Sequence, residues 1–144
     1  MSEQQTFQNH PRFHPLFHFV GFPILAISLI YFIVRVFQDF SWDRLMFVFL
    51  ILGIVATFFL SRVNALKVQD RVIRLEERLR YKELLPNDLA EKASNFKTSQ
   101  MIALRFASDK ELLDLVERTL NGEFATTKDI KLAIKNWRGD YLRV

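Results

Sequence analysis

Two stretches of this chain carry no charged side chain, and each is about as long as a bilayer is thick. Residues 15–34 and 45–61 contain no Lys, Arg, Asp or Glu. At about 1.5 Å per residue, a helix over the first run covers about 30 Å, and the second run lies at the short end for a span. Fifteen phenylalanines, most of them before Leu60, are more large rings than a water-soluble chain of this size can cover. We expect transmembrane helices over residues 15–37 and 45–62.

The distribution of basic residues predicts the orientation of this hairpin. Of the 20 Lys and Arg residues, only Arg12, Arg35 and Arg44 precede Arg62. The positive-inside rule therefore places both termini in the cytoplasm and the connector, residues 38–44, outside. A signal peptide is the alternative for the first run. It fits poorly, because the preceding segment is long and weakly basic, the apolar run is too long, and no small-residue cleavage site follows.

The second span is expected to continue as a cytoplasmic helix over residues 63–85, because no Gly or Pro occurs between Gly53 and Pro86. Small residues at intervals of four, then aliphatic residues with the 4-3-4 spacing of a coiled coil, follow one another along this helix. They form the predicted helix-packing seam: Gly53, Thr57, Ser61, Ala65, Val68, Val72, Leu75 and Leu79. Two interpretations stay open: a homodimer or partner-binding seam, or a face that the first span and the C-terminal helices of the same chain cover.

A basic stripe lies beside the seam, at Lys67, Arg71, Arg74, Arg78 and Lys82. Basic residues close to a membrane surface attract anionic headgroups. The predicted anionic-lipid contact comprises the residues nearest the second span: Arg62, Lys67, Arg71 and Arg74. The alternatives are docking against the acidic stretch around Glu111 and a solvated face with local ion pairs, namely Asp70 with Arg74 and Glu76 with Arg80.

The remaining residues, 86–144, predict a small helical module. Pro86 breaks the long helix, the sequence from Ser108 to Glu111 has the pattern of a capping box, and Asn121-Gly122 is a typical helix end. A last helix is expected to begin near Thr126 and to carry Ile130, Ile134 and Trp137 on one face. No alternating strand pattern follows Ser61. The expected fold is an all-α membrane protein: a cytoplasmic segment at residues 1–14, a two-helix transmembrane hairpin whose second span continues into a long cytoplasmic helix, and this module.

The three histidines, His10, His14 and His18, are four residues apart and are the only candidates for a metal or haem site. Pro11 and Pro15 interrupt a helix there, and no thiolate exists in a chain without cysteine. The spans lack the ionisable residues of an ion path, and no phosphate-binding glycine loop occurs. The sequence therefore predicts neither an enzyme nor a cofactor. The basic face of the last helix lacks interleaved aromatic residues, so no nucleic acid is expected either.

Several motifs resemble an uncharacterised bacterial family of small two-span membrane proteins, a domain of unknown function. They are Asn9-His10-Pro11-Arg12-Phe13 with Phe17-His18-Phe19, the run from Leu66 to Glu77, the run from Ile102 to Asp109, and the run from Ala133 to Arg138. The resemblance spans nearly the whole chain. It implies a bacterial cytoplasmic (inner) membrane protein and brings no substrate, cofactor or catalytic residue.

Three functions follow as alternatives. The first is a non-enzymatic membrane-anchored adaptor or accessory subunit that presents its helical module to a protein partner or to itself. Its partners would be a bilayer with anionic headgroups and either a second copy or a larger membrane complex. The second is a metal- or haem-binding membrane protein that uses the N-terminal histidines. The third is a transporter accessory subunit or small oligomeric channel.

Overall fold

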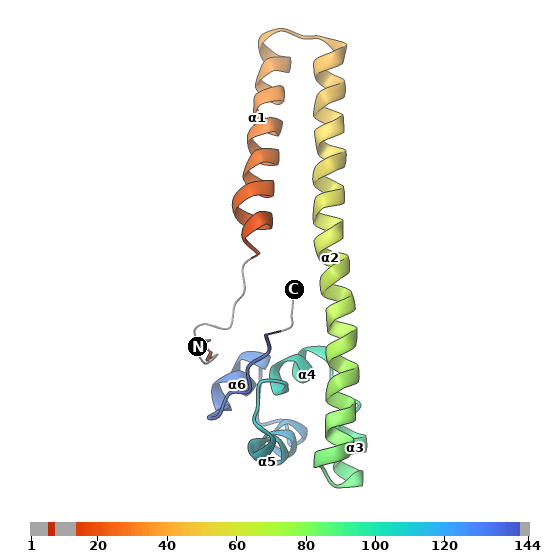
Figure 1. Cartoon of the computed structure of the whole chain (residues 1–144), viewed down its shortest axis with the longest axis vertical. Helices are drawn as coiled ribbons and strands as arrows, with labels where there is room; N and C mark the ends of the chain where they lie inside the picture. Colours follow the sequence, from red (N-terminus) through yellow and green to blue (C-terminus); the bar gives the residue numbers. More distant parts are fainter. Residues whose placement is uncertain (1–5, 8–13, 142–144) are drawn as a thin grey trace. The chain divides into compact units, whose positions relative to one another are not determined.

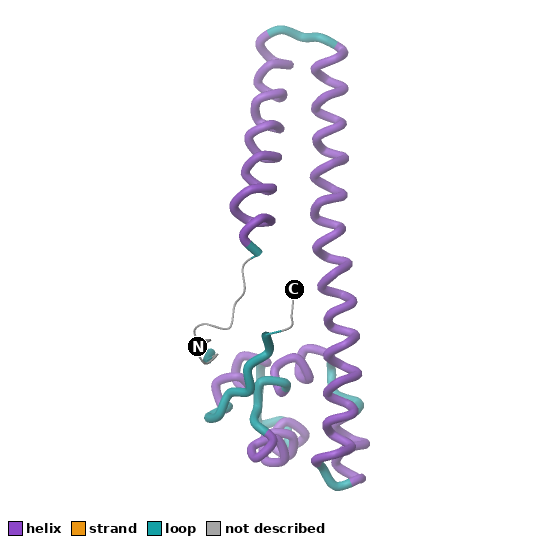
Figure 2. The backbone as a smooth tube through the Cα atoms, viewed as in Figure 1, coloured by secondary structure: helices purple, strands orange, loops and turns teal. Residues whose placement is uncertain are grey.

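The computed structural model describes residues 6–7 and 14–141, and these consist of helices and connecting loops (Figures 1 and 2). No β-strand occurs among the described residues, as the sequence predicted; a lone antiparallel bridge joins Ala107 to Trp137. The chain divides into two compact units, one over Arg12–Leu66 and one that includes Lys67–Val144. The helix α2 contributes to both units.

The first unit begins with a π-helical segment, η1 (Leu16–Gly21), which leads directly into α1 (Phe22–Gln38). The backbone N–H of Phe22 donates to the carbonyl oxygen of Phe17, five residues earlier. Pro23, in the first turn of α1, has no N–H to donate. A wide π-helical turn at this position accommodates the missing donor.

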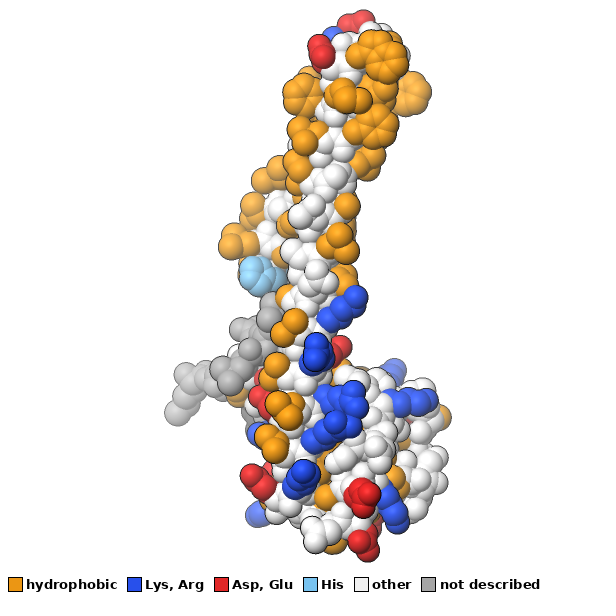
Figure 3. All heavy atoms as spheres, turned by 90° about the vertical axis from the view of Figure 1, so that its right-hand side faces the viewer, with side chains coloured by type: hydrophobic (Ala, Val, Ile, Leu, Met, Phe, Trp, Pro, Cys, Tyr) orange, Lys and Arg blue, Asp and Glu red, His pale blue; other side chains and the backbone are white. Residues whose placement is uncertain are grey.

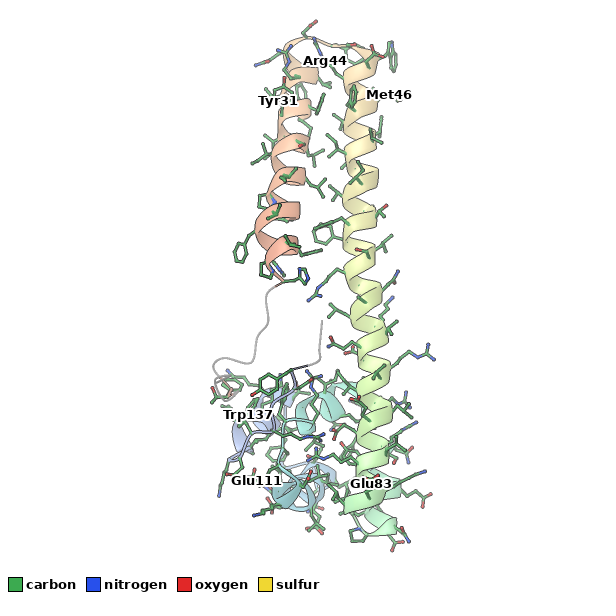
Figure 4. All side chains as sticks on the ribbon, in the orientation of Figure 1. Tyr31, Arg44, Met46, Glu83, Glu111 and Trp137 are labelled. Atoms are coloured by element: carbon green, nitrogen blue, oxygen red, sulfur yellow. The ribbon has the colours of Figure 1, made fainter. Side chains whose placement is uncertain are left out.

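The connector between the apolar helices is shorter than the sequence suggested. The helix α2 (Trp42–Leu84) begins three residues before the second uncharged run. Asp43 in its first turn is favourable beside the positive end of the helix dipole. Arg44, labelled in Figure 4, pairs with Asp39, where Nη1 and Oδ2 are 2.5 Å apart. This pair closes the connector over the end of α1.

Aromatic rings join α1 and η1 to α2 within this unit. The rings of Phe17 and Phe58 stack with their centroids 4.2 Å apart, and those of Phe32 and Phe47 stack at 5.0 Å. A Cβ atom added at Gly21 would lie 2.8 Å from the Phe58 ring. Gly21 therefore allows Phe58 to approach η1 and to stack on Phe17. Both Leu16–Gln38 and α2 are long and apolar enough to cross a membrane.

The helix α2 is one unbroken helix of 43 residues. After it, the chain forms four short helices: α3 (Asn87–Ala93), α4 (Thr98–Leu104), α5 (Asp109–Leu120) and α6 (Thr127–Ala133). The core of the module consists of fully buried large side chains from these helices, from the loop between α4 and α5, and from α2: Tyr81, Met101, Leu104, Phe106, Leu112, Leu115, Val116 and Ile130.

The helix α5 begins where the capping pattern predicted, but the predicted capping box does not form. The Ser108 side chain makes no capping hydrogen bond. The carboxylate of Glu111, labelled in Figure 4, instead accepts from the backbone N–H groups of Lys135 at 3.0 Å and Asn136 at 2.8 Å. The Glu111 carboxylate therefore accepts hydrogen bonds from a distant segment of the chain and not from the start of its own helix.

The end of the last helix also differs from the prediction. Thr126 and Asp129 form a complete capping box, so the start is correct. The helix stops at Ala133, however, and Ile134 is already extended. The expectation that Ile130, Ile134 and Trp137 share a helical face is therefore wrong. Trp137 still reaches the core, because its bridge to Ala107 sets its ring 5.0 Å from the Phe106 ring.

The contact at Gly21 predicts a position-specific effect of alanine. Gly21→Ala places a methyl group against a ring that Phe17 already holds in place, and we expect a loss of stability of about 1–3 kcal/mol. Gly53 is the matched control, because a Cβ atom there meets nothing within 4 Å. Gly53→Ala should be neutral or stabilising by up to about 1 kcal/mol through helix propensity. Thermal unfolding in mild detergent measures both variants; equal melting temperatures would contradict the packing role of Gly21.

Candidate functional site

The part of α2 beyond Leu66 has one face that is exposed and one face that is buried. The aliphatic residues of the seam remain exposed: Val68 by 61%, Val72 by 48%, Leu75 by 60% and Leu79 by 53%. Figure 3 shows hydrophobic side chains in a row along this helix, beside a row of Lys and Arg. The C-terminal helices therefore do not cover these four residues. A continuous apolar strip of this kind marks an interaction surface more often than does a scatter of single exposed side chains.

The opposite face of α2 is where the helical module packs. Four residues of α2 and the residue directly after it are buried there: Ile73, Glu77, Arg80, Tyr81 and Leu85. Their spacing of four, three, one and four residues follows the helix period. The buried face therefore follows a second helical period along α2. This period is hard to recognise in the sequence because two of its residues, Glu77 and Arg80, are charged.

Arg80 is the centre of a buried ionic cluster. Its Nη1 lies 3.3 Å from the carboxylate of Glu77, and the two side chains are 8% and 4% exposed. Its Nη2 donates to Asp109 at 2.7 Å and to the carbonyl oxygen of Ala107 at 2.7 Å, and its Nε donates to Asp109 at 3.0 Å. The guanidinium group thus ties α2 to the start of α5. Arg138 approaches Glu77 at 4.0 Å from the other side.

Burial controls the titration of the groups in this cluster. Loss of hydration raises the pKa of Glu77, and the positive charges of Arg80, Arg138 and Arg105 only partly oppose this shift. Burial also raises the pKa of Tyr81, and the nearby negative charge of Glu77 adds to the effect. The Tyr81 hydroxyl finds no hydrogen-bond partner among the described residues. The phenol therefore stays protonated at physiological pH.

An open cleft lies beside the cluster, between α2 and the last described residues. Acidic residues such as Glu76 and Asp140 line it together with basic residues such as Arg105 and Arg138. Arg105 and Asp140 form an ion pair at 3.1 Å. The mixed charge of the cleft favours no single sign of ligand.

Three of the four predicted lipid-contact residues are exposed on α2, and the fourth, Arg62, is half-buried. Lys67, Arg71 and Arg74 are exposed, and the guanidinium of Arg62 lies over the Phe17 ring, 5.9 Å from its centroid. The predicted local pairs of Asp70 with Arg74 and Glu76 with Arg80 do not form. Arg80 is drawn instead into its tertiary contacts with Asp109 and Ala107.

The small residues of the seam satisfy their polar groups within α2. Thr57 donates its hydroxyl to the carbonyl oxygen of Gly53 at 2.9 Å, and Ser61 donates to that of Phe58 at 2.9 Å. Apart from the local backbone of α2, no atom lies within 4 Å of the position that a Cβ atom would take at Gly53. The close approach of α1 and η1 to α2 occurs at Gly21 instead. The helices η1 and α1 thus leave this end of the stripe open, and the role of the stripe in helix packing stays a prediction.

Two of the three histidines can be placed. The backbone N–H of His18 donates to the carbonyl oxygen of His14 at 3.0 Å, and His18 Nδ1 lies 3.0 Å from the same oxygen. The His18 ring meets the Phe17 ring edge-on at 5.0 Å. His10 lies outside the described residues. In the described part of the chain, no three His, Asp or Glu side chains gather as metal ligands would.

The Glu77–Arg80–Asp109 cluster escaped the sequence analysis. The basic stripe drew attention to the exposed arginines, and Arg80 was assigned to a local pair. The signal that could have revealed the cluster is the apolar period through Ile73 and Tyr81, which places Glu77 and Arg80 on a buried face.

One protein-family model matches the whole chain, residues 1–144, and its description is "Family of unknown function" (DUF6526). This agrees with the uncharacterised family that the motifs indicated. No curated protein and no solved structure matches the chain.

The raised pKa of Glu77 predicts how stability depends on pH. The folded state holds the Glu77 proton more tightly than the unfolded state, so this group stabilises the fold fully below its ordinary pKa of 4.5. The contribution is lost as pH rises through the higher folded pKa. Glu77→Gln should remove this fall in stability, whereas Glu76→Gln, at an exposed neighbour, should keep it.

Thermal unfolding in mild detergent between pH ~4 and pH ~8 tests this linkage. Near-ultraviolet circular dichroism follows the packing of Tyr81 and Trp137 during the transition. Parallel pH profiles for the wild-type chain and Glu77→Gln would show that Glu77 does not titrate with a raised pKa in the folded state.

Proposed function

The chain belongs to the DUF6526 family, a family of unknown function, so we propose a function from the residues of the chain itself. We propose that the protein is a membrane-anchored adaptor without enzymatic activity. In this proposal the hairpin of α1 and α2 lies in a lipid bilayer. The module of α3–α6 is presented on the cytoplasmic side to a protein partner or to a second copy of the chain.

The observation that carries this proposal is the outward direction of the apolar side chains of the hairpin. Phe19, Ile27, Phe37, Phe49 and Leu60 are each exposed by more than half. Exposed apolar surface on this scale is unfavourable in water and favourable in hydrocarbon. The hydroxyls of Thr57 and Ser61 bond within their own helix, which suits a medium without other donors and acceptors.

The distribution of charge supports the proposed orientation. Seventeen of the 20 Lys and Arg residues, including Arg62, Lys67, Arg71 and Arg74, follow the second uncharged run. The positive-inside rule assigns that side to the cytoplasm, and in a bacterial cell the membrane would be the inner one. These four residues would then lie near the anionic headgroups of the inner leaflet.

Single-cysteine labelling tests insertion and orientation together, because the natural chain has no cysteine. Ser41→Cys lies in the connector and Ser99→Cys is exposed on α4. We expect a membrane-impermeant maleimide to label Ser41→Cys in intact spheroplasts and Ser99→Cys only after permeabilisation. Both variants should resist extraction with alkaline carbonate. Extraction into the soluble fraction would overturn the anchoring, and the opposite labelling pattern would overturn the orientation.

A further inference from the structure

We propose that the exposed seam of α2 pairs with the same seam of a second copy, as a parallel two-stranded coiled coil over residues 65–83. The inference rests on the proposed anchoring of both copies in one membrane. The second copy would be the partner of the apolar seam that the module leaves exposed.

The seam fits a heptad register along α2. Ala65, Val72 and Leu79 occupy a positions, and Val68 and Leu75 occupy d positions. At the centre of the seam, Val72 at a and Leu75 at d form the combination that favours two strands over three or four. Lys82, at the next d position, and Pro86 end the apolar seam.

The module packs on the side of α2 that a coiled coil does not use. Successive residues are about 100° apart around a helix. On this measure the buried group around Glu77 and Arg80 is centred nearly opposite the line through Val68, Val72, Leu75 and Leu79. In the heptad register, the buried residues Ile73, Glu77 and Arg80 are at b and f positions. Leu79, Glu76 and Glu83 also line the open cleft beside Arg138 and Tyr141, but Leu79 keeps 53% of its surface exposed. A second helix can therefore lie along the seam while the module stays in place.

The charges that flank the seam select the partner and its direction. Arg71 and Arg78 occupy g positions on one flank of the seam. Glu76 and Glu83 occupy e positions on the other flank, and Glu83 is labelled in Figure 4. In a parallel pair, each g residue faces the e residue five positions later in the second helix. Arg71 would face the second copy's Glu76, and Arg78 the second copy's Glu83. An antiparallel pair would set g against g and e against e, which brings like charges together.

These side chains are available for such contacts. Arg71, Glu76 and Glu83 are exposed and form no ion pair within the described residues. Arg78 donates through Nε and Nη2 to the carbonyl oxygen of Ser94, at 3.0 and 2.8 Å. A guanidinium group has five N–H donors, so others remain for a carboxylate.

The short length of the seam explains why anchoring matters. The apolar layers cover fewer than three heptads, less than a free coiled coil requires. Two chains held in one membrane have a raised effective concentration, and their α2 helices enter the cytoplasm in the same direction. Both effects favour the parallel pair that the flanking charges specify.

Disulfide cross-linking in membranes tests the pairing. Val68→Cys and Leu79→Cys lie near opposite ends of the seam, and one arrangement lets both cross-link to their own counterparts only if the pair is parallel and in register. Arg74→Cys, exposed but off the seam, is the matched control. After mild oxidation we expect a species of twice the chain mass for both seam variants, at about five times the yield of the control or more. This difference reflects the Cβ separation at a and d positions.

Charge exchange at an exposed pair tests the specificity without disturbing the fold. In the Val68→Cys background, Arg71→Glu and Glu76→Arg should each lower the dimer yield several-fold, because each faces like charges. Co-expression of the two should restore it, because both cross-helix pairs become opposite in sign again. This rescue separates a specific coiled coil from a destabilised chain.

The remaining outcomes decide against the inference. Equal yields at Val68, Leu79 and Arg74 would show random collision. Cross-links at the seam to a different protein would assign it to another partner, and no cross-link in membrane-embedded chain would leave it facing lipid or solvent. Carbonate extraction of the same samples separates these results from a failure of anchoring, because a chain that is not retained in the membrane overturns the proposed function itself.

Discussion

The guanidinium group of Arg80 brings together the elements on which the rest of the structure depends. It bonds to Glu77 on its own helix, to the side chain of Asp109 at the start of α5, and to the backbone of Ala107. The segment that leads into α5 is thereby fixed on one face of α2. Since a helix has a limited circumference, this choice also determines which face remains for other contacts, and that face carries Val68, Val72, Leu75 and Leu79.

A buried charge pair is an expensive way to join two helices, because the loss of hydration opposes the attraction between the charges. The raised pKa of Glu77 is the sign of that cost. Aliphatic residues at positions 77 and 80 would pack more favourably, but α2 would then have apolar residues around most of its circumference. The module could dock on the seam as readily as on its own face. Buried charges with specific partners remove that ambiguity, which we regard as the reason for the Glu77–Arg80 pair in this fold.

The sequence predicted the features that depend on local chemistry. Uncharged length predicted the two apolar helices, the absence of Gly and Pro predicted an unbroken α2, and Thr126 and Gly122 marked real helix ends. The sequence-based predictions failed where a distant part of the chain binds a side chain that was expected to make a local contact. Glu111 left its capping box for the backbone at Lys135 and Asn136, and Arg80 left its predicted pair with Glu76 for Asp109. The apolar spacing of the seam is visible in the sequence, but whether the chain covers these residues depends on tertiary packing that no periodicity reveals.

Arg78 connects the two faces of α2. Its guanidinium holds the carbonyl oxygen of Ser94 at the end of α3, while its heptad position places it on the flank of the seam. In a paired seam the same group would also face a carboxylate of the second copy. Ordering the long Arg78 side chain costs conformational entropy. Because the contact with Ser94 already orders this side chain in the single chain, association would lose less entropy. The folded module would thus preorganise one of the charges by which α2 recognises its counterpart, so that folding of the module and association along the seam would support each other.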